Sequence, residues 1–353
     1  MIKTKNQIKI LIADISCFSY KGKPTGHYWK TAKYYKNILK QDFNVIIGGS
    51  KEYFTYFDKS EILKFRYSNR SDDNYTLYDT FTKIIKEILN IKKAFSYECD
   101  IIIFQSCALL SICIALFFIK TNKKIILIQY TNLLKYFKYR ILYKFIKNKI
   151  SGIITSIKDV GKSYSNNYLV IPDYIYEGET NKVQYKSKFI YDFCVIGNIG
   201  LGKDIEDIVN VMKKTKYSVI IAGHFNDINR FNNLLRIKSD NIKIINKFIS
   251  YDKYINIIQN SKYVILPYKE YYNNASSGVV FDAIFNETPV ISTKVNSLNF
   301  ITKYNLGYQY KVSIKEFLNI NIDYNLLRNN IIKYLKKNEE NGLQLIEFMK
   351  NSY

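Results

Sequence analysis

The stretch IYDFCVIGNIGLGKD, residues 190–204, combines a mostly apolar run, a glycine-rich turn and the start of a helix. The run has the length of a buried strand, and three glycines follow it at positions 197, 200 and 202. Glycine lets the backbone approach an anion closely, and a helix start offers free N–H groups and a positive dipole end. Lys203 can place its ammonium against the same anion. The stretch fits neither GxGxxG nor a P-loop, so a phosphate cradle and a purely structural turn are both open.

The alternation of strand and helix continues beyond this turn. Nearly continuous Ile, Val and Leu runs are typical of strands buried on both faces of a parallel sheet, and amphipathic stretches of helical length separate them. We expect strands over 190–196, 218–222, 241–245, 263–266 and 289–293. We expect helices over 204–214, 227–237, 251–260 and 278–285.

An equivalent series occupies the first half of the chain. Apolar runs at 8–14, 44–48, 101–105, 124–129 and 152–155 predict strands. Amphipathic stretches at 28–40, 81–95, 109–120 and 133–149 predict helices. A chain of 353 residues is too long for one ordinary core, so two domains are expected.

These patterns predict an α/β fold of two Rossmann-like doubly wound domains that face a cleft. We place an N-terminal domain at 1–173 and a C-terminal domain at 174–335. The polar segment 174–188 is the expected hinge. Residues 336–353 are expected to form a C-terminal helix, for which packing back on the N-terminal domain is one alternative.

A second candidate site is the stretch ASSGVVFDA, residues 275–283. Ser276, Ser277 and Gly278 precede an amphipathic helix, so backbone amides and two hydroxyls can converge on an anion there. Asp282 lies one turn further along, where a carboxylate can accept two hydrogen bonds from a ribose diol. The alternative is that Ser276 is a plain helix cap and Asp282 lies on a solvated face.

The order of elements adds specificity to these two signals. A strand ending in Gly223 and His224, a strand ending in Leu266 and Pro267, the second candidate site and the sequence ETPVIS at 287–292 follow the glycine-rich turn. Over about residues 190–310 this order resembles the group 1 (family 4 type) GT-B glycosyltransferases, and the N-terminal half matches that family in layout.

The resemblance implies that the domain at 1–173 binds the acceptor and the domain at 174–335 binds the nucleotide-sugar. It also implies a role for each matching position. Lys203 would neutralise the diphosphate of a nucleotide-sugar donor, with Gly200 and Gly202 giving it room. Ser277 and Gly278 would present backbone N–H groups to the phosphates. The nucleoside would contact the ribose-holding carboxylate and the lining of the base pocket: Asp282, His224, Phe248 and the backbone of Ile249.

The chain also departs from the family pattern. An arginine of the first turn is replaced by Asn198, which removes one phosphate cation. The first acid of the family's paired-glutamate motif falls on Asn274, and Glu270 lies nearby but out of register. The retaining stereochemistry usual in the family is therefore not implied for this chain.

An inverting transfer needs a base that deprotonates the acceptor hydroxyl. The candidates are His27, in the loop after the first strand, and Asp14, at the end of that strand. Preorganised N–H groups and a lysine can stabilise the leaving diphosphate without a metal, and the sequence has no DxD pair. We therefore expect a metal-independent enzyme without a cofactor, whose co-substrate is the nucleotide-sugar.

Charge indicates an anionic partner. The net charge is +23, with 29 Lys and Arg against 13 Asp and Glu in residues 1–173, and 24 against 17 in residues 174–353. The segment 133–150 has six basic residues and no acid, as a helix on an anionic leaflet would. The alternatives are a core-packing helix with a solvated basic face and lysine enrichment for solubility alone.

The apolar run 108–119 has 12 residues, short of the ~20 that span a bilayer, so we expect a soluble or peripheral protein. Five cysteines without CxxC spacing favour a reducing cytoplasm. With the basic segment 133–150, we expect a peripheral protein at the inner face of the plasma membrane.

The predicted function is hexosyl or related transfer from a nucleotide-sugar to a hydroxyl of a glycan or polyprenyl-diphosphate-linked acceptor, as in bacterial surface polysaccharide (O-antigen or capsule) synthesis. The alternatives are a nucleotide-sugar epimerase or hydrolase of the same fold, a dehydrogenase and, on charge alone, a nucleic-acid-binding protein. The chain lacks the GxGxxG of the dehydrogenases and every common nucleic-acid-binding motif, so no nucleic acid is expected as a partner.

Overall fold

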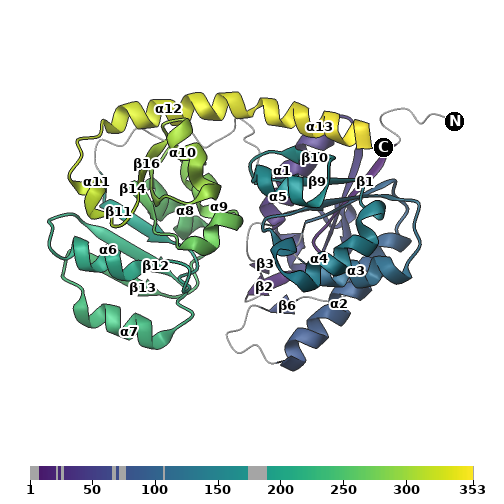
Figure 1. The fold of residues 1–353 in the computed structure, drawn as a ribbon, viewed down its shortest axis with the longest axis horizontal. Coiled ribbons are helices and arrows are strands. Elements are labelled where there is room, and N and C mark those ends of the chain that lie inside the picture. Colours follow the sequence, from purple (N-terminus) through teal and green to yellow (C-terminus); the bar gives the residue numbers. More distant parts are fainter. Residues whose placement is uncertain are drawn as a thin grey trace. The chain divides into compact units, whose positions relative to one another are not determined.

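The computed structural model describes residues 8–20, 23–24, 28–65, 69–70, 77–105, 108–173 and 189–352. The chain divides into two compact units (Figure 1). The first unit holds Met1–Ile175 and Glu340–Tyr353, and the second holds Tyr176–Glu339. The expected hinge, residues 174–188, lies outside the described residues.

The first unit is built on a parallel sheet of seven strands in the order β10-β9-β8-β7-β1-β4-β5. Its strands are β1 Lys9–Ala13, β4 Asn44–Gly49, β5 Ile62–Lys64, β7 Ile101–Phe104, β8 Lys124–Ile128, β9 Gly152–Thr155 and β10 Tyr168–Val170. A small sheet in the order β3-β2-β6 accompanies it: β2 Phe18–Tyr20, β3 Lys23–Pro24 and β6 Asn69–Arg70.

Helices cover both faces of the seven-stranded sheet, as the continuous apolar strands require. One face packs on α1 Tyr28–Leu39 and on α13 Glu340–Ser352. The other face packs on four helices: α2 Leu77–Ser96, α3 Leu109–Phe118, α4 Phe137–Ile146 and α5 Lys158–Tyr164. The stretch 133–149, expected as one helix, consists of α4 between two short 3-10 helices, Leu133–Lys135 and Lys147–Lys149.

The second unit contains a parallel sheet of six strands in the order β13-β12-β11-β14-β15-β16. Its strands are β11 Tyr191–Ile196, β12 Val219–Gly223, β13 Ile242–Asn246, β14 Ser261–Leu266, β15 Val290–Thr293 and β16 Gly307–Tyr310. Its helices are α6 Ile205–Met212, α7 Ile228–Ile237, α8 Tyr251–Gln259, α9 Gly278–Phe285, α10 Asn299–Lys303, α11 Lys315–Leu318 and α12 Tyr324–Asn338.

In each sheet, the order in which successive strands are added reverses at the first strand of the unit. In the first unit β1 lies between β4 and β7, and in the second unit β11 lies between β12 and β14. Open parallel sheets bind ligands beyond the carboxyl ends of the strands at such switch points. The fold is thus α/β with two Rossmann-like parallel sheets, and it provides one such position in each unit.

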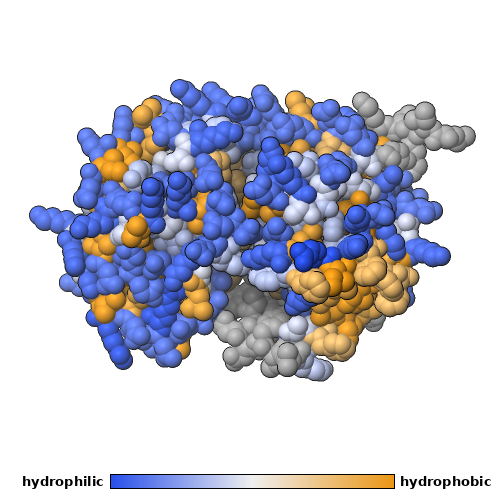
Figure 2. Space-filling model, viewed as in Figure 1, coloured by the Kyte–Doolittle hydropathy of each residue, from blue (hydrophilic) through white to orange (hydrophobic). Residues whose placement is uncertain are grey.

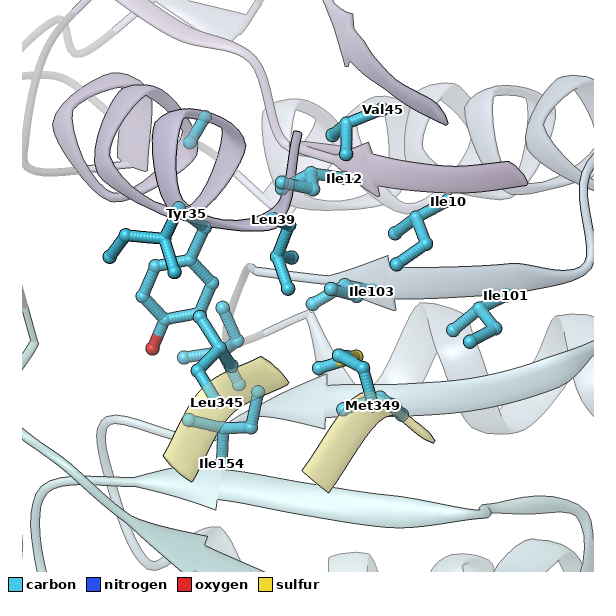
Figure 3. Close-up of a cluster of buried hydrophobic side chains, with 14 of the residues drawn as sticks. Ile10, Ile12, Tyr35, Leu39, Val45, Ile101, Ile103, Ile154, Leu345 and Met349 are labelled. Carbon is cyan, nitrogen blue, oxygen red and sulfur yellow. The ribbon is translucent and has the colours of Figure 1, made fainter. Parts of the chain in front are cut away.

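The end of the chain returns to the first unit. The helix expected over 336–353 is interrupted, because α12 ends at Asn338 and α13 begins at Glu340. Leu345 and Met349 of α13 lie in the same buried cluster as Ile10 and Ile103 of the sheet (Figure 3). In the ranges that the structure describes, no helix is long and apolar enough to cross a bilayer.

We expect Leu345→Ala to lower the free energy of unfolding of the first unit by about 2–5 kcal/mol, because it leaves a cavity in this cluster. Urea unfolding followed by fluorescence measures this directly, since Trp29, the one tryptophan of the chain, is buried in the same cluster. Leu343→Ala on the same helix is the control, because that side chain is 70% exposed. Equal losses in the two variants would contradict the packing of α13 on this sheet.

Candidate functional site in the second unit

The glycine-rich turn after β11 is held by a close backbone crossing with β12. Gly197 has φ +96°, a conformation that L side chains rarely adopt. A Cβ at Gly223 would lie 1.7 Å from the carbonyl oxygen of Gly197, so no larger residue fits there. The N–H of Gly197 donates to Ala222 O at 3.1 Å, and the N–H of Ile199 donates to His224 O at 2.8 Å. The glycines therefore fix the path of the turn against the neighbouring strand.

The end of β14 fixes the other side of the turn. The N–H of Asp204 donates to Pro267 O at 2.7 Å, and the N–H of Lys269 donates to Gly202 O at 2.9 Å. Lys203 and Tyr268 form an antiparallel bridge between these two bonds. The turn thus lies across the carboxyl ends of β11 and β14, which is the switch point of this sheet.

Lys203 is the central group of the turn. Its side chain folds back so that Nζ donates to Ile196 O at 3.0 Å, and the residue is only 3% exposed. Nζ also lies 5.9 Å from the centroid of the Tyr268 ring. No carboxylate in the described part of the chain pairs with this ammonium, and burial lowers the pKa of Lys203 to about 7. An anion arriving at the turn would supply the counter-charge that the protein does not.

Arg230 of α7 binds the backbone of the turn, and no sequence pattern indicated this residue. Its guanidinium makes two hydrogen bonds to the Glu206 carboxylate on α6. The same guanidinium donates to two carbonyls of the turn, Gly200 O at 2.9 Å and Lys203 O at 2.6 Å. These bonds tie the backbone carbonyls of the turn to the helix side. The contact spans about 30 positions in sequence and has no local motif that could have indicated it.

The second candidate site meets the first through Tyr268. Ser277 is the residue before α9, and its hydroxyl lies 2.5 Å from the Tyr268 hydroxyl. Val279, in the first turn of α9, approaches Gly197, since a Cβ there would lie 3.4 Å from Val279 Cγ2. The side chain of Ser277 does not cap the helix, so the first N–H groups of α9, from Gly278 onward, are not used by it. The two stretches that the sequence singled out therefore form one site, and Ser276 lies half-buried at its border.

Asp282 lies one turn inside α9 and is 7% exposed. Its Oδ2 accepts a hydrogen bond from the Tyr254 hydroxyl of α8 at 2.9 Å. The alternative of a solvated face is wrong for Asp282, because the carboxylate is buried between two helices. Its position one turn beyond the helix start is compatible with a role toward the ribose.

His224 and Phe248 follow the ends of β12 and β13. His224 is half-buried, its carbonyl accepts the bond from Ile199, and Phe248 is 45% exposed. Asn198 is exposed on the turn, and Glu270 and Asn274 are the ends of the 3-10 helix Glu270–Asn274 before α9. The predicted donor-site residues thus gather at the carboxyl edge of one sheet.

The corresponding edge of the first unit contains Asp14. Its Oδ2 accepts the Tyr53 hydroxyl at 2.7 Å, and its Oδ1 accepts the N–H groups of Ser16 and Cys17 at 3.2 and 3.1 Å. Burial raises the pKa of this carboxyl to about 6. These bonds show that Asp14 organises the turn after β1. His27, the other base candidate, lies outside the described residues.

Gln105 follows β7 at the same switch point. Ala13 pairs with Phe104, and the N–H of Gln105 donates to Ala13 O at 3.1 Å, so Asp14 and Gln105 end neighbouring strands. Both side-chain atoms of the Gln105 amide are buried without a hydrogen-bond partner among the described residues. A buried amide without partners costs stability, so it needs an explanation, and a ligand that supplies the partners is one. Gln105 was not identified as a functional residue from the sequence.

Among the residues that the structure describes, no three His, Cys, Asp or Glu side chains gather as they would around a metal ion. The candidate ligand positions among the described residues are the edge of the second unit that contains Lys203 and the edge of the first unit that contains Gln105.

No protein-family model and no curated protein sequence matches this chain. Many solved structures match its fold. The UDP-forming α,α-trehalose-phosphate synthase from Burkholderia xenovorans, in complex with glucose-6-phosphate, is 10% identical, with a TM-score of 0.66 over 98% of this chain and 99% of that one. AviGT4, a glycosyltransferase of avilamycin A biosynthesis, is 10% identical, with a TM-score of 0.64 over 97% and 98%. Anabaena HepE, in complex with UDP and glucose, is 12% identical, with a TM-score of 0.59 over 98% of both chains.

These similarities extend over essentially the whole chain and over both units. They confirm the predicted resemblance and show that the fold is the GT-B fold of glycosyltransferases.

We predict that the buried ammonium gives the protein a stability that rises with pH. The pKa of Lys203 is about 7 in the folded chain and about 10.5 when unfolded, so between these values the unfolded chain holds the extra proton. Unfolding free energy should then rise by about 1.4 kcal/mol per pH unit from this group. Urea unfolding between pH 7 and 9 should show this slope in wild type and in the exposed control Lys214→Met. Lys203→Met should lack it, and parallel profiles for all three proteins would show that the ammonium is not buried.

Proposed function

We propose that this protein is a glycosyltransferase that moves a hexosyl or related sugar from a nucleotide-sugar to an acceptor hydroxyl. The observation that carries this proposal is the Lys203 ammonium, buried at the switch point of a GT-B fold with no acidic partner among the described residues. A diphosphate is the anion that suits it, because the start of α9 lies beside the turn and adds N–H donors that the Ser277 side chain does not use.

Sugar transfer places negative charge on the departing nucleoside diphosphate. A cation that is already desolvated and fixed in position stabilises that charge more than a solvated one, because it needs no reorganisation. Lys203 has both properties, since Ile196 O and the Tyr268 ring fix its position. We propose on this ground that the leaving group is stabilised by Lys203 and the α9 amides without a metal ion.

The nucleoside would extend from the diphosphate toward α8 and the ends of β12 and β13. Asp282, oriented by Tyr254, is the proposed partner of the ribose hydroxyls. His224 and the exposed ring of Phe248 are the proposed lining of the base pocket. HepE, one of the structures with this fold, contains UDP and glucose, which supports a nucleotide-sugar as the donor.

The acceptor is proposed to bind at the first unit. The unpartnered Gln105 amide offers a donor and an acceptor together, as a sugar hydroxyl does. Asp14 would position the turn beside it, and His27 is kept as the proposed base. A glycan or polyprenyl-diphosphate-linked saccharide is the proposed acceptor, at the cytoplasmic face of the membrane, in surface polysaccharide synthesis.

The proposal predicts proton uptake on donor binding. Near pH 8 most Lys203 side chains are neutral, and a bound diphosphate should raise the pKa of Lys203 so that about one proton enters the complex. Titration calorimetry in buffers of different ionisation enthalpy measures this for UDP, GDP and CDP against their nucleosides.

Lys203→Met should abolish the uptake and weaken diphosphate binding by about 1.5–3 kcal/mol, while nucleoside binding stays unchanged. Lys214→Met, on the exposed end of the segment after α6, is the matched control. Diphosphate affinity that survives in Lys203→Met would refute the assignment of the turn.

For the acceptor side, Gln105→Met keeps the shape of the side chain and removes the unpartnered amide. We expect unfolding free energy to rise by about 1–3 kcal/mol and sugar transfer to a lipid extract to fall, with diphosphate affinity unchanged. Gln129→Met is the control, because Gln129 after β8 is also buried with an unpartnered amide but lies one strand away from the switch point. It should gain the same stability and transfer normally; normal transfer in Gln105→Met as well would exclude a role for that amide.

A further inference from the structure

The outer face of α3 is unusual for a helix at a protein surface. The helix contains no charged residue, and its one hydroxyl, from Ser111, points inward to Glu87. Its outward stripe is formed by apolar side chains: half-buried Leu110 and Ile114, and exposed Phe117 and Phe118. A surface helix normally places polar residues outward, so this face is suited to a partner and not to water.

Helix α4 continues the same apolar surface. It packs beside α3, and its own outward stripe repeats every four residues at Phe137, Ile141 and Phe145. The phenylalanines of the two helices are between 61% and 77% exposed. Figure 2 shows the result as a contiguous hydrophobic patch over the position of α3 and α4 in Figure 1. We call these residues, Phe117, Phe118, Phe137, Ile141 and Phe145, the aromatic patch.

The segment that forms the aromatic patch is rich in basic residues and contains no acidic ones. Residues 101–158 contain no Asp or Glu, and nine Lys and Arg lie between positions 108 and 150. Those on α4 and on the two short helices that flank it are all exposed: Lys135, Lys138, Arg140, Lys144, Lys147 and Lys149. Some of them lie over the aromatic rings, such as Arg140 at 5.7 Å from the centroid of Phe137. Apolar centre and basic rim therefore occupy one surface.

We infer that this surface docks on a bilayer that contains anionic phospholipids. Aromatic side chains suit the boundary between head groups and acyl chains, and each lysine or arginine near an anionic leaflet adds to the attraction. A second copy of the chain would bring the same uncompensated basic rim against itself, which like-charge repulsion opposes. The sequence indicated the basic helix alone; the structure adds α3, so the surface has two apolar helices and inserts rings from both. This inference stands whether or not the donor site is assigned correctly.

Flotation with vesicles tests the inference, using phosphatidylcholine alone and phosphatidylcholine mixed with an equal amount of phosphatidylglycerol. The wild-type chain should float with the mixed vesicles and lose that binding at high salt, because screening removes the basic contribution. Binding to phosphatidylcholine alone should be much weaker. Wild-type protein that stays unbound, or binds both vesicles equally, overturns the inference.

Two pairs of variants test the composite surface, F117S/F118S on α3 and F137S/F145S on α4. Each pair should weaken binding to mixed vesicles about tenfold or more, since it removes two rings that enter the boundary. Replacing Lys138 and Lys144 by Gln should weaken it by a similar factor. V312S/L343S is the apolar control, because Val312 and Leu343 are 86% and 70% exposed on other elements. Urea unfolding followed by the fluorescence of Trp29, which is buried in the first unit, should match wild type in all of them and so shows that the variants fold.

Vesicle binding that survives in both phenylalanine pairs overturns the inference, and loss in the α4 pair alone overturns the part that involves α3. Sedimentation velocity without lipid tests the alternative that a second copy of the chain binds the patch. If the wild-type chain is a dimer that the phenylalanine pairs convert to a monomer while vesicle binding persists, the patch is a contact between copies and the bilayer assignment is wrong.

Discussion

A positive charge placed inside a protein without a counter-charge is the constraint around which the second unit is organised. Lys203 loses most of its hydration. In exchange its ammonium makes one hydrogen bond to Ile196 O and lies over the Tyr268 ring, 5.9 Å from the centroid. Such a group is normally paired or displaced to the surface, because desolvating a charge is expensive. Here the cost appears as a pKa lowered to about 7, and either loss of the proton or an anion beside Nζ relieves it.

The backbone that retains this charge is held by contacts on three sides. The Gly197–Gly223 crossing fixes the turn against β12, the bonds to Pro267 and Lys269 fix it against β14, and Arg230 fixes its carbonyls against α6 and α7. The hydrogen bonds of the Arg230 guanidinium go to the Glu206 carboxylate and to backbone carbonyls of the turn, so this arginine has a scaffold role. Its positive charge is offset by Glu206 within the scaffold, whereas Lys203 has no such carboxylate partner among the described residues.

The sequence predicted correctly those elements whose bounds are marked by local signals. The strand β9 and the helix α9 have the bounds that the sequence indicated, because a continuous apolar run bounded by polar residues and a helix preceded by small residues are both local signals. The edge strands β5, β10 and β16 were missed, since they have few residues and little burial. Arg230, the Tyr268–Ser277 contact and the unpartnered Gln105 were missed for another reason: each depends on which strand ends meet, and that is set by sheet order.

The apolar stretch that contains α3 shows the limit most clearly. The sequence predicted a helix over 109–120, and the structure shows that α3 buries one side and leaves the apolar side chains of the other side exposed. Composition cannot distinguish a helix that is enclosed by protein from a helix whose apolar side is exposed to a partner or a bilayer, because both require the same side chains. The distinction comes from exposure, and exposure is known only when the neighbours, α2 on one side and α4 on the other, are in place.

The two switch points differ in the charge of the side chains beside them, and this difference suits the proposed transfer between two unlike substrates. The edge of the second unit has an uncompensated cation, which favours an anionic donor over a neutral sugar. The edge of the first unit has Asp14, with Glu87 close to it and a pKa raised by burial, beside a neutral amide that lacks partners. The amide can bind a sugar hydroxyl through both its donor and its acceptor atoms. The two switch points therefore offer unlike surroundings, a lysine in one unit and hydroxyl-binding groups in the other, which is the division that the proposed transfer needs.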